Sequence, residues 1–386
     1  MNRDPKGPVP QKEESTMLGD DIKKLGFGLM RLPKIGQDED IEQTKKMVDL
    51  FMSKGFTYFD TAYVYDGGKS EMALKECVVD RYPRDSFVCA SKLPLWNAES
   101  EEQLPLLAQE SLDRAGVEYF DFYLVHSLNK DLYEKAEKLH AFSFMQKFKA
   151  EGKAKHIGFS FHDSPEVLER ILTDHPEAEF VQLQINYKDW EDDVVQSRGC
   201  YETARRFGKP VVIMEPVKGG SLVTMTDEVQ QLFKSVHPDM SIASWAVRFA
   251  ASHEGILTVL SGMSNMEQME DNTSFMENFR PLDEKELETV AKAVEIINAI
   301  PTIPCTACRY CVDGCPMKIN IPGVFKALNH YTVYNNPEAA KKQYDRAVKD
   351  GGKASECLQC GQCMEHCPQH IDIIETLKKA PELFGE

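Results

Sequence analysis

The sequence has no apolar run that approaches the ~20 residues of a membrane-spanning helix, so we expect no transmembrane segment. Positive charge is also scarce, because 45 Lys and Arg face 62 Asp and Glu and leave a net charge of −17. This balance argues against nucleic-acid and anionic-lipid partners. Met1–Met17 lacks the apolar core of a signal peptide, which predicts a cytoplasmic protein with a flexible N-terminal arm over residues 1–20.

A glycine-rich G-x-G-x-x-G turn between a strand and a helix is missing too, which disfavours a doubly wound sheet. Instead, eight short apolar runs predict strands at Lys24–Met30, Phe56–Asp60, Ser86–Ser91, Phe120–His126, Ala154–Ser160, Phe180–Ile185, Pro210–Glu215 and Ile256–Ser261. Amphipathic segments predict helices at Ile41–Lys54, Ser70–Val79, Gln103–Ala115, Leu132–Ala150, Pro165–Leu172, Asp193–Phe207, Ile242–Ser252, Met266–Met276 and Asp283–Ala299. This alternation predicts an α/β fold, a (β/α)8 TIM barrel over residues 21–298.

Cysteines are rare in the first 300 residues, with three of the eleven, and frequent afterwards. The helix- and strand-resistant stretch Ile300–Pro304 marks the boundary of a second domain, residues 299–386. There, two copies of C-x2-C-x2-C-x3-C-P contain Cys305, Cys308, Cys311, Cys315, Cys357, Cys360, Cys363 and Cys367. Disulfides and zinc sites are weaker alternatives, because the chain lacks an export signal and zinc prefers paired ligands.

This spacing is that of bacterial ferredoxins, and it predicts two [4Fe–4S] clusters in a ferredoxin-type domain. In such domains the fourth cysteine of each run reaches the other cluster. We therefore assign Cys305, Cys308, Cys311 and Cys367 to one cluster and the remaining four to the other. The long segment between the runs predicts two helices, Pro322–Tyr331 and Pro337–Lys349, so the domain should be small and mostly helical.

Three successive predicted strands end in polar side chains. Asp60 ends the second strand, Lys92 the third and His126 the fourth, while Tyr65 follows the second strand in a loop. Active sites of TIM barrels lie at these strand ends. A rim ion pair, a core histidine and loop packing would explain the residues separately. Together they suit carbonyl reduction, with Tyr65 as proton donor, Lys92 lowering its pKa, Asp60 holding Lys92 and His126 orienting the carbonyl.

Residues 21–298 resemble the aldo/keto reductases. The likeness rests on Phe59-Asp60-Thr61-Ala62 with Tyr65, on Ser91-Lys92, on Val125-His126-Ser127 and on Ile157-Gly158-Phe159-Ser160. It implies that Asp60, Tyr65, Lys92 and His126 form the catalytic tetrad. It also implies a nicotinamide cofactor across the barrel mouth, with its carboxamide held by Ser160 and Gln182 and its adenine end near Asn272.

The sequence departs from the family at three places. Met214 replaces the aromatic residue that usually stacks on the nicotinamide, and Phe161 replaces an asparagine. Gly262 and Gln268 stand where NADP-using members carry a lysine and an arginine. The choice between NAD(H) and NADP(H) therefore stays open. Arg31, just after the first strand, is a candidate anchor for an anionic substrate or a cofactor phosphate, with a rim salt bridge as the alternative.

The favoured function is hydride transfer between a nicotinamide cofactor and a small carbonyl or alcohol, accompanied by iron–sulfur electron transfer and a possible redox protein partner. The clusters carry single electrons whereas nicotinamide carries a hydride, and no flavin motif that would join them is visible. An electron-transfer or sensing module, whose barrel acts mainly as a docking platform, is the alternative. A purely structural ferredoxin fusion is a weaker third.

Overall fold

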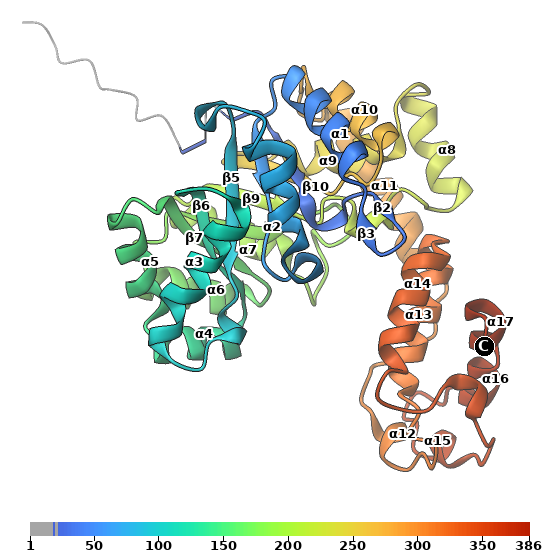
Figure 1. Ribbon diagram of the computed structural model, residues 1–386. Helices are drawn as coiled ribbons and strands as arrows, with labels where there is room; N and C mark the ends of the chain where they lie inside the picture. The colour runs from blue at the N-terminus through green and yellow to red at the C-terminus, as the bar shows by residue number, and fades with distance from the viewer. Residues whose placement is uncertain (1–17, 20–21) are drawn as a thin grey trace, which may run out of the picture.

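The computed structural model describes residues 18–19 and 22–386. The arm predicted for residues 1–20 lies outside them, except for Leu18 and Gly19. The chain forms a barrel surrounded by helices, and a helical C-terminal lobe, α12 to α17, projects from one side of it (Figure 1). Within the described residues, none of the helices is long and apolar enough to cross a membrane.

Eight parallel strands close the barrel in the order β1-β10-β9-β8-β7-β6-β5-β4. They are β1 Leu25–Gly28, β4 Tyr58–Asp60, β5 Val88–Leu93, β6 Phe120–Leu128, β7 Ala154–Phe161, β8 Phe180–Gln184, β9 Val211–Met214 and β10 Ile256–Ser261. Each overlaps one of the predicted strands, so the barrel prediction is confirmed and the doubly wound alternative is wrong. A short antiparallel hairpin, β2 Lys34–Ile35 and β3 Asp38–Glu39, follows the first strand.

The barrel helices are α1 Ile41–Ser53, α2 Lys69–Leu74, α3 Leu104–Ala115, α4 Lys130–Lys138, α5 Ala141–Ala150, α6 Pro165–Asp174, α7 Ser197–Arg206, α8 Asp227–Val236, α9 Ile242–Ala251, α10 Met266–Met276 and α11 Glu284–Ala299. The single helix predicted over Leu132–Ala150 is wrong. Backbone φ is +51° at His140, a left-handed conformation that ends α4 and starts α5. Helix α8 was not predicted, although Thr226 with Asp227 and Glu228 forms a typical acidic helix start.

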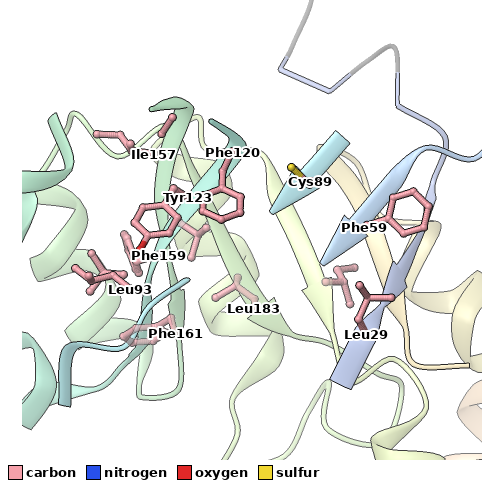
Figure 2. Close-up of a cluster of buried hydrophobic side chains, with 14 of the residues drawn as sticks. Leu29, Phe59, Cys89, Leu93, Phe120, Tyr123, Ile157, Phe159, Phe161 and Leu183 are labelled. Carbon is pink, nitrogen blue, oxygen red and sulfur yellow. The ribbon is translucent and has the colours of Figure 1, made fainter. Parts of the chain in front are cut away.

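Side chains alternate between the two faces of each strand, as the pleat requires. One set fills the barrel interior and includes Tyr58, Ala90, Phe122, Leu124, Phe180, Val212 and Leu260. Their strand neighbours form a layer between the barrel and its helices, part of which Figure 2 shows around Phe59, Cys89, Tyr123, Phe159 and Leu183. A residue two positions after an interior residue points to the same side of its strand. Near the C-terminal end of a strand, such a residue must therefore face the barrel mouth.

The C-terminal lobe consists of α12 Tyr310–Asp313, α13 Ile321–Tyr334, α14 Pro337–Ala347, α15 Gln362–Glu365, α16 Ile373–Leu377 and α17 Lys379–Phe384. It has its own apolar core, in which Phe325 and Tyr344 are almost fully buried. Helix α15 begins 52 residues after α12, and α16 begins 52 residues after α13. The two cysteine runs are separated by the same 52 residues. The internal repeat is thus present in the backbone as well as in the sequence.

The lobe contacts the barrel through the C-terminal end of α13. Ser221 Oγ lies 3.1 Å from His330 Nε2, and Thr224 Oγ1 donates to the carbonyl of Tyr334 at 2.9 Å. The Tyr334 ring packs in one apolar cluster with Leu222 and other residues of the segment after β9. The loop after β9 is therefore part of the barrel mouth and of the contact with the lobe.

Candidate active site and cysteine cavities

Strand alternation brings the predicted site residues to one place. Asp60, Lys92, His126, Ser160, Gln182 and Met214 each lie two residues after an inward-facing position on β4, β5, β6, β7, β8 and β9. The first five of these side chains are at least nine-tenths buried, although they are polar. A buried polar group costs free energy unless it is hydrogen-bonded, so the partners of these residues decide what the site can do.

Lys92 is completely buried, and its ammonium group donates three hydrogen bonds to Asp60 and Thr61. They go to Asp60 Oδ1 at 2.7 Å, Asp60 Oδ2 at 2.8 Å and the Thr61 carbonyl at 2.8 Å. Burial opposes the charge on Lys92, but the carboxylate of Asp60 outweighs it, and the pKa of Lys92 is raised. Burial also raises the pKa of Asp60, and Lys92 offsets this only in part. The prediction that Asp60 holds Lys92 agrees with this geometry.

Tyr65 lies at the start of a short 3-10 helix, Tyr65–Gly68, next to this pair. The Lys92 Nζ is 4.9 Å from the centroid of the Tyr65 ring. Desolvation of the hydroxyl raises the pKa of Tyr65, and the nearby Lys92 charge lowers it by less. The predicted lowering of the tyrosine pKa by Lys92 is present, but desolvation outweighs it. The phenol is kept protonated, as a proton donor requires.

His126 completes the group. Its ring meets the Tyr65 ring edge-on, with centroids 6.1 Å apart, and lies 5.0 Å from the ring of Trp96. Burial, followed by the Lys92 charge, holds the pKa of His126 well below its usual value, so the imidazole is neutral. Its Nδ1 is buried, and no residue in the described part of the chain forms a hydrogen bond with it. Trp190, in the segment after β8, stacks on His253 at 4.3 Å and belongs to the packing around α9.

Ser160 and Gln182 lie on neighbouring strands in register with each other. The Ser160 Oγ accepts from the Ser127 amide at 2.7 Å, which leaves its proton available to a ligand. The Gln182 Nε2 contacts the Met214 sulfur at 3.4 Å, while its buried Oε1 has no partner. A carboxamide would satisfy both residues, accepting from Ser160 and donating to Gln182. These residues therefore fit the nicotinamide carboxamide.

The remaining predicted cofactor residues are more dispersed. The Gln268 side chain is exposed and folds back to accept from the Ser264 amide at 2.7 Å. Asn272 is buried and accepts from Ser261 Oγ at 2.8 Å, so it braces the end of β10. Phe161 faces away from the mouth, into the apolar layer of Figure 2. Gly262 leaves a space at the mouth that the Arg31 side chain occupies.

A second buried network lies behind the site and was not predicted. Glu71 is fully buried and accepts from Ser91 Oγ at 2.7 Å and from Arg114 Nε at 2.6 Å. Ser91 precedes Lys92 on β5, and Glu71 belongs to α2, which directly follows the Tyr65 helix. The network therefore ties the Tyr65 segment to the strand of Lys92. Only the presence of a carboxylate among the apolar residues of α2 signalled it in the sequence.

The eight clustered cysteines line two separate cavities. Cys305, Cys308, Cys311 and Cys367 line one of them. Cys315, Cys357, Cys360 and Cys363 line the other. These are the two sets that the spacing predicts, with the fourth cysteine of each run crossing to the other cavity. Among the described residues, no three His, Cys, Asp or Glu side chains converge closely enough to hold one metal ion.

Left-handed residues recur at matching places around both cavities. Ala307 and Gln359, each just before the second cysteine of its run, have φ of +55° and +54°. Arg309 and Gly361, each just after it, have φ of +67° and +81°. Such turns point successive backbone N–H groups into a concavity that suits an anionic group, iron–sulfur clusters included. The backbone thus fits two clusters of the same kind.

Comparison with known families identifies both parts of the chain. The model of the Aldo/keto reductase family matches residues 24–295, and the model of a 4Fe-4S dicluster domain matches residues 304–371. Together they include the barrel and both cysteine cavities.

Individual proteins point the same way. A probable aldo-keto reductase of Glycine max is 29% identical over 213 residues, 52% of this chain and 58% of its own length. An uncharacterized oxidoreductase of Bacillus subtilis is 23% identical, over 70% of this chain and 92% of its own. The chain thus spans little more than half the length of the first relative.

Two solved structures share the fold. An aldo-keto reductase of Klebsiella pneumoniae in complex with NADPH has a TM-score of 0.57 at 20% identity, covering 70% of this chain and 90% of its own. The holo form of an aldo-keto reductase from Bacillus halodurans has a TM-score of 0.57 at 23% identity, covering 72% and 95%.

Proposed function

Because the chain belongs to the aldo/keto reductase family, we propose that it is an oxidoreductase that interconverts a small-molecule carbonyl and an alcohol with NAD(H) or NADP(H). One observation carries the proposal. The fully buried pair of Lys92 and Asp60 lies beside a protonated Tyr65 and a neutral His126 at the mouth of the barrel. Neither the charge pair nor the two rings beside it are needed to hold a barrel together, but all four side chains suit proton transfer to a carbonyl oxygen.

The cofactor fits this mouth through its carboxamide. Ser160 would donate to the carboxamide oxygen, and the unpaired Gln182 Oε1 would accept from its nitrogen. Met214, at the end of β9, would pack against the nicotinamide ring. The bound nicotinamide supplies the hydride during reduction and accepts it during oxidation.

The chain's own residues manage the proton. Neutral His126 holds and orients the substrate oxygen by a hydrogen bond, since its charged form is disfavoured. Tyr65 donates its hydroxyl proton to that oxygen as negative charge develops there. Lys92 stabilises the phenolate that remains by its charge and by the hydrogen bond between the two side chains. In the oxidation direction Tyr65 takes the proton back.

The test is the variant Tyr65→Phe, which removes one oxygen atom. Carbonyl reduction should fall by about 10²–10⁴-fold, while nicotinamide binding, followed by fluorescence, stays within about twofold. Tyr63→Phe is the matched control, since Tyr63 lies in the same segment and its ring packs under Arg114. Full activity in Tyr65→Phe would remove Tyr65 as the proton donor, whereas a wild-type protein that reduces no carbonyl would favour the barrel as a docking platform.

For the C-terminal lobe we propose two [4Fe–4S] clusters, bound by the two sets of four cysteines. Such clusters exchange single electrons. One cavity is lined by Ile321 at the start of α13, whereas the barrel contacts Tyr334 at its end. These positions are about 20 Å apart along the helix. This separation favours electron exchange with a redox protein partner at the far surface of the lobe.

A further inference from the structure

Arg31 is a cation at the barrel mouth without a counter-ion among the described residues. It ends the short 3-10 helix Leu29–Arg31, which follows β1 and is anchored where the Ser70 hydroxyl donates to the Leu29 carbonyl at 3.0 Å. The Arg31 side chain is exposed, and it forms no ion pair with any residue in the part of the chain that the structure describes. The alternative of a rim salt bridge therefore does not apply within these residues.

The stem of Arg31 occupies the space above Gly262. A methyl group added to Gly262 would lie 3.3 Å from the Arg31 Cδ and 3.4 Å from its Cβ, closer than ordinary van der Waals contact. Position 262 is where resemblance to NADP-using relatives leads one to expect a lysine. This chain has glycine at that position, and the side chain of Arg31 occupies the space beside it.

The guanidinium reaches the neighbouring loop after β9. A methyl group on Gly219 would lie 3.2 Å from the Arg31 Nη2. Gly219 and Gly220 both have left-handed backbones, with φ of +65° and +94°, so the chain turns tightly and without side chains beside the guanidinium. Lys218 does not compete for the same ligand, because its ammonium pairs with Asp189 at 2.5 Å.

We propose that Arg31 binds a phosphate of the nicotinamide dinucleotide, in place of the cation that is missing after β10; this inference rests on the proposed function. A guanidinium binds phosphate oxygens through two parallel N–H bonds, and the glycines let a ligand approach the backbone closely. In a chain with a net charge of −17, a dianionic ligand also needs a local cation. The phosphate belongs either to the diphosphate, present in both cofactors, or to the 2′-phosphate of NADPH.

The experiment measures the dissociation constants of NADH and NADPH for the full-length protein and for Arg31→Ala, by protein fluorescence. Arg31→Ala should bind about tenfold to a hundredfold more weakly, the range expected for a charge-assisted bond. Arg31→Lys should recover part of the lost affinity, because lysine supplies a positive charge but not the two parallel N–H donors of arginine. Lys153→Ala is the control, because it removes one partly exposed positive charge before β7, at the opposite end of the barrel.

The two cofactors separate the possible sources of the phosphate. Equal weakening of NADH and NADPH assigns Arg31 to the diphosphate, and weakening of NADPH alone assigns it to the 2′-phosphate. Unchanged binding of both by Arg31→Ala, at an unchanged unfolding temperature, overturns the inference and leaves the proposed function standing. A wild-type protein that binds neither cofactor overturns both.

Discussion

The barrel mouth and the C-terminal lobe hold their functional groups in different ways. At the mouth, the polar side chains are carried by strands, and protein atoms satisfy the most strongly charged of them, as the three bonds of Lys92 show. In the lobe, the cysteines lie largely in loops and short helical turns, and Cys308 and Cys360 are exposed. The fold alone positions the side chains of the mouth, whereas the cysteine loops need a bound group to fix their conformation.

The lobe nevertheless has a core of its own. Helices α13 and α14 pack together, and Tyr344 stacks on Phe384 at 4.6 Å, while Cys311 and Cys363 are buried in the same cluster. The two cysteine runs lie outside this helical pair and are joined mainly by contacts between α12 and α15. Removal of the metal should therefore affect the two halves of the protein very unequally.

The largest effect should follow loss of iron. Chelation of the iron, or the variant Cys311→Ala, should abolish the brown colour and unfold the cysteine loops, since metal-binding free energy is folding free energy in such sites. The barrel should keep its own thermal transition. Calorimetry together with visible absorbance checks this, with Cys200→Ala, a buried barrel cysteine, as control. Simultaneous melting of barrel and lobe would show that the two regions are not independent.

Much of this division was visible in the sequence. The barrel followed from eight apolar runs, and Asp60, Lys92 and His126 stood out because each lies at the end of such a run. The cysteine sets followed from the spacing alone. Local patterns of this kind report strand faces and loop lengths, which depend on neighbouring residues.

Features that depend on distant residues were missed. The pKa of Tyr65 depends on how far its surroundings exclude water, which no motif encodes. The network of Glu71 and Arg114 joins residues 43 positions apart, and the contact between Ser221 and His330 joins residues 109 apart. The break at His140 was missed because its neighbours are good helix formers on both sides.

A second prediction tests how far the mouth depends on protein atoms alone. Lys92→Met should remove the cation and leave Asp60 buried without its partner, which costs about 3–5 kcal/mol of unfolding free energy. The double variant Lys92→Met with Asp60→Leu should recover much of this stability but no activity. Urea titration of the barrel and a carbonyl reduction assay separate the two effects. Equal stability of Lys92→Met and wild type would contradict a tightly coupled pair.

The smallest effect concerns the contact between the two regions. Burial, helped by Lys218 and Lys326, lowers the pKa of His330 from its usual 6.5 to about 4. A histidine released from the contact therefore binds more protons than a docked one between these values, so docking should weaken as the pH falls below about 6.5. The side chain is half-buried, and solvent screening should limit the loss to about tenfold at about pH 5.

The variant His330→Gln isolates this contribution, because glutamine still hydrogen-bonds Ser221 but does not titrate. Small-angle X-ray scattering at about pH 7 and about pH 5 should show the wild-type protein expanding as the lobe separates from the barrel, and the variant changing less. The other histidines are identical in the two proteins and cancel in the comparison. The same expansion in both would assign the pH dependence to a group other than His330, and no expansion in either would mean that the apolar packing of Tyr334 holds the lobe.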